Sequence, residues 1–184
     1  VREALADPKK KEIYSRFMDK SQVAMAGHWD TANNYVNGIE DYLPTEQYRR
    51  PMHQKKVVED ILENWIQYSQ NNKFHGMFAT SSIAEAIEYY RLFKKLNPEL
   101  KTTALFDPNI DNNENAKFKE DGLVEIISDY NNRYGMEFSL ATHAKMKRDI
   151  ADRLAHKELY KRVEHTPDKQ LDLLIVVDQM LTGF

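Results

Sequence analysis

The chain has 184 residues, of which 41% are hydrophobic, so one domain with a core of its own is expected. Its 26 basic and 29 acidic residues give a net charge of −3, which argues against a polybasic nucleic-acid binder but permits a local basic patch. Cysteine is absent, which excludes disulfide frameworks, cysteine zinc sites and thiol nucleophiles. The longest apolar run, over 173–177, is far shorter than the ~20 residues of a membrane span. We therefore expect a mixed α/β protein of the cytoplasm.

The first third of the chain is the least regular part. Turn-forming and helix-breaking residues interrupt it at Pro8, Gly27, Gly38, Pro44 and Pro51. We predict a loop-rich connector with short helices over 1–54, one of them over 12–18, and a folded domain over 55–184.

Beyond residue 54 the sequence alternates between helical and extended patterns. Apolar residues recur at helical spacing over 54–70, 83–96, 116–134 and 140–160, and Gly135 is expected to end the third of these helices. Strands are predicted over 74–79, 102–106 and 171–178. Strands separated by helices imply right-handed crossovers, so the expected fold is α/β, a parallel sheet with flanking helices.

The last predicted strand is a nearly continuous run of apolar and β-branched residues. Such runs are typical of inner strands, which are buried on both faces and need covering helices. The sequence ends at Phe184, soon after this strand. We therefore expect the chain to be a piece of a larger protein.

Common catalytic and metal-binding motifs are missing from the sequence. It has no GxxxxGK[ST], GxGxxG, HExxH or GxSxG pattern, and its six histidines lack the spacing of metal ligands. The acidic residues Asp107, Asp111 and Glu114 do not match a calcium loop, and turn chemistry is the simpler interpretation. No metal or cofactor is therefore expected to be bound to this chain.

The segment from Phe78 to Ser82 leads from a predicted strand into the start of a helix. Ser82 is in the position of an N-cap, and Glu85 three residues later fits a capping box. The free backbone N–H groups of such a terminus can hold a phosphate, so the hydroxyls of Thr80, Ser81 and Ser82 are candidate ligands. The simpler interpretation is that Ser82 only caps the helix.

The segment from Val176 to Phe184 carries the second group of candidates. A buried strand leads to Asp178, and the turn-forming pair Thr182 and Gly183 follows. An ordinary turn explains this glycine equally well. In a parallel sheet, however, both segments lie at the carboxyl ends of strands, where α/β proteins bind ligands. Together they predict a backbone- or phosphate-binding rim.

Two runs of the sequence, 73–90 and 173–184, resemble the R (motor and restriction) subunit of type I restriction enzymes. The resemblance covers roughly 55–184. It implies a superfamily 2 helicase relative, in which a nuclease domain precedes two RecA-like motor domains. Such a protein hydrolyses ATP, translocates along double-stranded DNA and cleaves it. The chain would hold part of the second RecA-like (P-loop NTPase-type) domain, and residues 1–54 would join the two motors.

The resemblance also implies roles for the candidate residues. Thr80, Ser81, Ser82 and Thr182 would contact DNA phosphates, and Asp178 and Gly183 would lie at the nucleotide cleft. The parent protein would use ATP and Mg²⁺, and its partners would be double-stranded DNA and the modification and specificity subunits. The lysine, acidic box and arginine of the ATP site and the nuclease carboxylates are not in this sequence. The chain by itself is therefore expected to be inactive.

Two other interpretations stay open at this point. The chain could belong to another superfamily 2 helicase, or to a chromatin-remodelling-type motor that shares both segments. It could also be a non-enzymatic α/β interaction module, which predicts no affinity for DNA.

Overall fold

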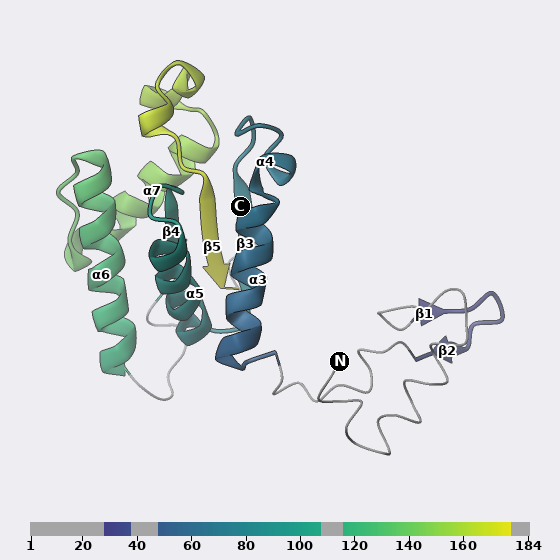
Figure 1. The fold of residues 1–184 in the computed structure, drawn as a ribbon. Helices are drawn as coiled ribbons and strands as arrows, with labels where there is room; N and C mark the ends of the chain where they lie inside the picture. Colours follow the sequence, from purple (N-terminus) through teal and green to yellow (C-terminus); the bar gives the residue numbers. More distant parts are fainter. Residues whose placement is uncertain (1–27, 38–47, 108–115, 178–184) are drawn as a thin grey trace. The chain divides into compact units, whose positions relative to one another are not determined.

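The computed structural model describes residues 28–37, 48–107 and 116–177 (Figure 1). The chain divides into two compact units, Val1–His53 and Gln54–Phe184. Several predictions lie outside the described residues: the helix over 12–18 and the candidate residues Asp178, Thr182 and Gly183.

The described part of the first unit contains a small antiparallel hairpin of β1 (His28–Trp29) and β2 (Tyr35–Val36). The carboxylate of Asp30 accepts the N–H of Asn34 at 2.8 Å, and Asn33 has a left-handed φ of 61°. Asp and Asn favour such turns because their side chains can bond nearby backbone groups. The predicted connector therefore contains a hairpin over 28–37, where only loops and short helices were expected.

The sheet of the second unit has three parallel strands in the order β3-β5-β4. They are β3 (Gly76–Thr80), β4 (Thr102–Leu105) and β5 (Leu173–Val177). The central strand β5 is buried along its whole length, whereas β3 exposes Met77 and Ala79. The prediction of a parallel sheet with a buried last strand is confirmed.

The last strand starts two residues later than predicted, because Asp172, the residue before it, contacts Lys101 at the start of the neighbouring strand. Asp172 is 8% exposed, and its carboxylate accepts the N–H of Lys101 at 2.9 Å and pairs with the Lys101 ammonium at 3.3 Å. Lys101 directly precedes β4, so this contact ties the starts of the two strands together.

Five α-helices surround the sheet in the described residues: α3 (Pro51–Glu63), α4 (Trp65–Tyr68), α5 (Ile83–Leu96), α6 (Ala116–Tyr134) and α7 (His143–Leu154). Helix α5 packs on all three strands and lies between α6 and α3 (Figure 1). The bounds of α5 and α6 are those predicted. No helix within the described ranges is long and apolar enough to cross a membrane.

Helix α6 approaches α5 closely at Gly122. A Cβ atom there would lie 2.5 Å from the Ile87 side chain, which is fully buried. At the other end of α6, Gly135 has a φ of +65°, and the next N–H bonds the Asn131 carbonyl at 3.1 Å. This is the Schellman geometry that glycine favours, so the predicted end of the helix is confirmed.

The helix predicted over 54–70 is two helices. It begins earlier, at Pro51, because proline is tolerated in a first turn. It breaks at Asn64, whose side-chain amide bonds the Asp60 carbonyl at 2.9 Å, and α4 follows.

The helix predicted over 140–160 is wrong beyond Leu154. A 3₁₀ turn, η3 (Leu140–Thr142), precedes α7, and the chain then leaves the helix with left-handed φ angles at His156 and Glu158. Three further 3₁₀ turns lead to β5: η4 (Glu158–Tyr160), η5 (Val163–His165) and η6 (Pro167–Lys169). The Tyr160 hydroxyl donates to the Asp149 carboxylate at 2.5 Å. This tertiary contact holds the segment after α7 against that helix.

Candidate nucleic-acid interface at the carboxyl edge of the sheet

The three strands end at one edge of the sheet, which we call the carboxyl edge. Thr80, the last residue of β3, lies opposite Val177, the last residue of β5. Leu105, the last residue of β4, lies opposite Val176 on the other side. Ser81 and Ser82 follow Thr80 directly, so this group of hydroxyls sits at the edge, as predicted. Asp178, Thr182 and Gly183 come after β5, outside the described residues.

The hydroxyl of Thr80 is engaged inside the fold. Thr80 is 4% exposed, and its Oγ1 lies 3.2 Å from the carbonyl oxygens of both Val176 and Ser82, to which it can donate. It therefore links β3 to β5 and to the loop that begins α5. Its contact with DNA stays a prediction, and that contact would have to replace one of these bonds.

Ser82 caps α5 as predicted. Its Oγ accepts the backbone N–H of Glu85 at 3.2 Å, and its own backbone is extended. The expected return bond of the capping box is shifted by one residue. The Glu85 carboxylate accepts from the N–H of Ser81 at 2.7 Å and from its hydroxyl at 2.8 Å.

The Glu85 carboxylate thus occupies a small anion-binding arrangement. Ser81 is exposed and presents one backbone N–H and one hydroxyl just before a helix N-terminus, where negative charge is stabilised. Phosphate oxygens of nucleic acids accept hydrogen bonds from groups of this kind. A phosphate can use these donors if the Glu85 side chain rotates away.

Three ionisable side chains meet at the end of β4. The ammonium of Lys147, on α7, lies 3.8 Å from the carboxylate of Asp107, two residues beyond β4. His143 at the start of α7 is 8% exposed, and its Nε2 has no hydrogen-bond partner among the described residues. Burial and then Lys147 lower the pKa of His143, while Asp107 opposes them. Sequence reasoning missed this group, although the i, i+4 spacing of His143 and Lys147 was readable.

Mg²⁺ and ATP, which the resemblance implies, can be compared with the residues present. No group of three or more histidine and acidic side chains able to hold a metal ion occurs within 28–37, 48–107 and 116–177. The described part of the carboxyl edge offers donors for a phosphate group at Ser81. It does not by itself form a Mg²⁺–ATP site.

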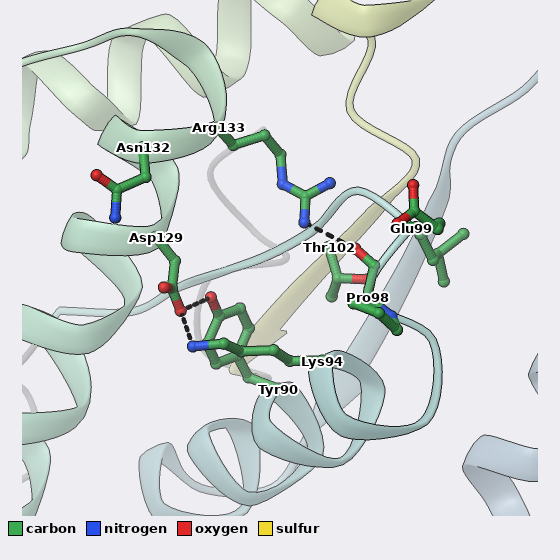
Figure 2. Close-up of a pocket in the computed structure, with 9 residues that line it drawn as sticks. Tyr90, Lys94, Pro98, Glu99, Thr102, Asp129, Asn132 and Arg133 are labelled. Carbon is green, nitrogen blue, oxygen red and sulfur yellow. Dashed lines mark hydrogen bonds and ion pairs between the residues drawn. The ribbon is translucent and has the colours of Figure 1, made fainter.

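The opposite edge, where the strands begin, contains a pocket of about 410 Å³ (Figure 2). Figure 2 shows the Asp129 carboxylate accepting from the Tyr90 hydroxyl at 2.7 Å and from Lys94, and Arg133 donating to the Pro98 carbonyl at 3.0 Å. Burial and then Asp129 raise the pKa of Tyr90 far above its usual range, so the hydroxyl stays a donor. Three charged groups of this pocket, those of Lys94, Asp129 and Arg133, are already engaged with one another or with the backbone, and ligands of α/β sheets favour the other edge.

A buried polar cluster also lies towards this amino edge. The Asp149 carboxylate accepts from Tyr130 at 2.6 Å, from Arg153 at 2.9 Å and from Tyr160. The Arg153 guanidinium stacks 3.7 Å from the Tyr134 ring centre, and it donates to the carbonyl of residue 169 at 2.7 Å. Sequence reasoning missed this cluster, although the i, i+4 pairs 130/134 and 149/153 were readable signals of it.

Comparisons with known proteins agree with this architecture. A family model described as type I restriction enzyme subunit R domain 3 matches residues 72–184. The endonuclease subunit of a type I restriction enzyme from Staphylococcus aureus strain MRSA252 is 33% identical over 136 residues, which are 70% of this chain and 14% of that protein. The corresponding subunit from Staphylococcus saprophyticus is 31% identical over 137 residues, with the same two coverages.

The chain thus spans about one seventh of the length of these curated relatives. The family model covers more than half of the chain and includes all three strands of the parallel sheet. The chain therefore belongs to the family of type I restriction enzyme R subunits, in the part that the family model describes as domain 3.

Proposed function

We propose that the chain is part of the second RecA-like motor domain of a type I restriction R subunit, and that its carboxyl edge contacts the DNA backbone. The observation that supports this most directly is the register of β3 and β5. Because Thr80 lies opposite Val177, β3 and β5 end side by side at the carboxyl edge, β3 within residues 73–90 and β5 within residues 173–184. These are the two segments that carry the resemblance.

In this proposal the edge residues have distinct roles. Ser81 and Ser82, with Thr80 and Thr182, hold phosphates of one strand, whereas Asp178 and Gly183 belong to the nucleotide cleft. The complete subunit would use ATP and Mg²⁺ and would act on double-stranded DNA together with modification and specificity subunits. Residues 1–54 would join this domain to the first motor domain.

Backbone contacts of this kind have a clear binding signature. They carry no direct sequence information, and they weaken as salt displaces the bound cations. The chain has a net charge of −3, so we expect affinity no better than the non-specific range of ~10⁻⁴–10⁻⁶ M.

The test is fluorescence anisotropy of the chain with two labelled 20-base-pair duplexes of unrelated sequence. We expect equal dissociation constants for the two duplexes and weaker binding at 200 mM than at 50 mM salt. Ser81→Ala should weaken binding, and Ser128→Ala, the same change on an exposed position of α6, should not. Absence of binding would favour a non-enzymatic interaction module, and a strong preference for one duplex would contradict a backbone-only interface.

The chain alone is expected to hydrolyse no ATP above background. Phosphoryl transfer needs a phosphate cradle, an acid that holds the metal and an arginine that stabilises the transition state. The sequence supplies no motif for these groups. Phosphate release that increases when DNA is added would contradict this assignment of the chain to only part of the motor.

A further inference from the structure

One face of α7 carries three neighbouring cations. Lys145 and Arg148 are exposed and Lys147 is half-buried, whereas Met146 and Ile150 on the opposite face are fully buried. At 3.6 residues per turn, Arg148 lies between Lys145 and Lys147 around the helix. The three cations therefore form one continuous basic face.

Most of the charge on this face is not neutralised inside the fold. Lys147 pairs with Asp107, but Lys145 and Arg148 have no ion pair within the described ranges. Asp152, one turn after Arg148, is half-buried and is not paired with it in the described structure. Some cations elsewhere in the described structure are paired, as Lys94 is with Asp129.

The basic face lies beside the carboxyl edge. Asp107, which Lys147 contacts, is two residues beyond the last residue of β4, and β4 is separated from β3 by β5 alone. Neighbouring strands are about 4.8 Å apart, so the ends of β3 and β4 are roughly 10 Å apart. A nucleic-acid strand covers this distance in about three nucleotides, at 3.4 Å each.

We propose that Lys145, Lys147 and Arg148 form a DNA-backbone contact surface that continues the carboxyl edge. Hydroxyls and backbone N–H groups position a phosphate, but Lys and Arg provide the salt-dependent affinity for nucleic acid. The hydroxyls of Thr80, Ser81 and Ser82 carry no positive charge. The inference deepens the proposed function and rests on it, because it takes the partner at this edge to be DNA.

The experiment compares two double variants that each remove two exposed cations. Lys145→Gln/Arg148→Gln changes the basic face. Lys157→Gln/Lys161→Gln is the matched control, in the segment between the end of α7 and the start of β5, towards the amino edge. Each lowers the net charge by two, and each changes only exposed side chains, which circular dichroism can verify.

Dissociation constants for a labelled 20-base-pair duplex are measured from 50 to 200 mM salt. We expect the basic-face variant to bind the duplex roughly fivefold more weakly, or worse, at 50 mM salt. The slope of the logarithm of the association constant against the logarithm of the salt concentration should become shallower by about two. The control should keep the slope of the unchanged chain. Equal losses in both variants, with binding by the unchanged chain, would overturn the α7 surface alone. No binding by the unchanged chain would overturn the proposed function together with it.

Discussion

The two edges of the sheet use their polar groups in opposite ways. At the amino edge, Asp149 accepts from three different side chains, and the side chain of Arg153, its ion-pair partner, is only 2% exposed. At the carboxyl edge, the donors of Ser81 are held by one half-exposed carboxylate, that of Glu85. The amino-edge cluster is closed to other partners, whereas the carboxyl-edge contact can be exchanged for a ligand. A closed hydrogen-bond network stabilises the fold, whereas a contact that can be exchanged leaves its donors available to a ligand.

The closed network also explains how the irregular segment after α7 is held. Arg153 donates to the carbonyl of residue 169, and Tyr134 donates to that of Gln170 at 3.0 Å. Both acceptors lie just before β5, so the cluster determines where the central strand begins. Its contribution is therefore to the whole sheet.

The largest effect is expected for Asp149→Ala. It leaves a buried guanidinium without its carboxylate and two tyrosine hydroxyls without an acceptor, and breaking a buried pair in this way costs about 3–5 kcal/mol. Urea unfolding followed by circular dichroism measures the change in the free energy of unfolding.

Asp152→Ala is the control on the same helix. Asp152 is half-buried, and we expect its replacement to change the free energy of unfolding by about 0.5 kcal/mol or less. If the two variants unfold alike, the amino-edge network does not stabilise the fold as argued.

The sequence predicted the regular parts of this fold more fully than its polar contacts. Helices α5 and α6 have the predicted bounds because a capping serine and a left-handed glycine mark their ends. The predicted end of α7 was wrong because the Tyr160 hydroxyl donates to Asp149, and local sequence patterns do not relate these two positions. Likewise, the placement of Ser81 and Ser82 was predictable from strand order, but the occupation of the Ser81 donors by Glu85 was not.

At the carboxyl edge, Ser82→Ala tests how much of this region is structural. The Ser82 Oγ is the acceptor for the Glu85 N–H, and loss of an N-cap costs about 1 kcal/mol. Ser81→Ala should have a smaller effect on stability, because the Ser81 N–H still bonds Glu85. Urea midpoints of the two variants provide the comparison, and a larger loss for Ser81→Ala would reverse the assigned roles.

Glu85→Gln tests whether the contact at this edge is exchangeable. Removing the negative charge of residue 85 leaves the Ser81 donors available to a phosphate. A negative charge near a helix N-terminus, such as that of a phosphate, is stabilised by about 0.3–1 kcal/mol. Duplex DNA should therefore bind roughly two- to fivefold more tightly in the anisotropy assay.

Glu88→Gln makes the same change of net charge one turn further along α5. Glu88 is exposed and accepts from Gln54 at 3.1 Å, away from Ser81. It should alter DNA affinity less than Glu85→Gln. An equal gain in both variants would show that overall charge, and not the Ser81 donors, controls binding.

The smallest expected effect is a dependence of the free energy of unfolding on pH. One histidine at each edge contributes to it. Burial lowers the pKa of both: His143 at the carboxyl edge, with Lys147 nearby, and His75, beside His156 and just before β3. A lowered pKa in the folded state means that the unfolded chain takes up protons first as the pH falls below about 6.5. The free energy of unfolding should therefore decrease between pH 7.5 and 5.5, above the range where carboxylates titrate. His143→Gln and His75→Gln should each flatten part of this decrease in urea unfolding, and a stability that rises on acidification would contradict the burial of both rings.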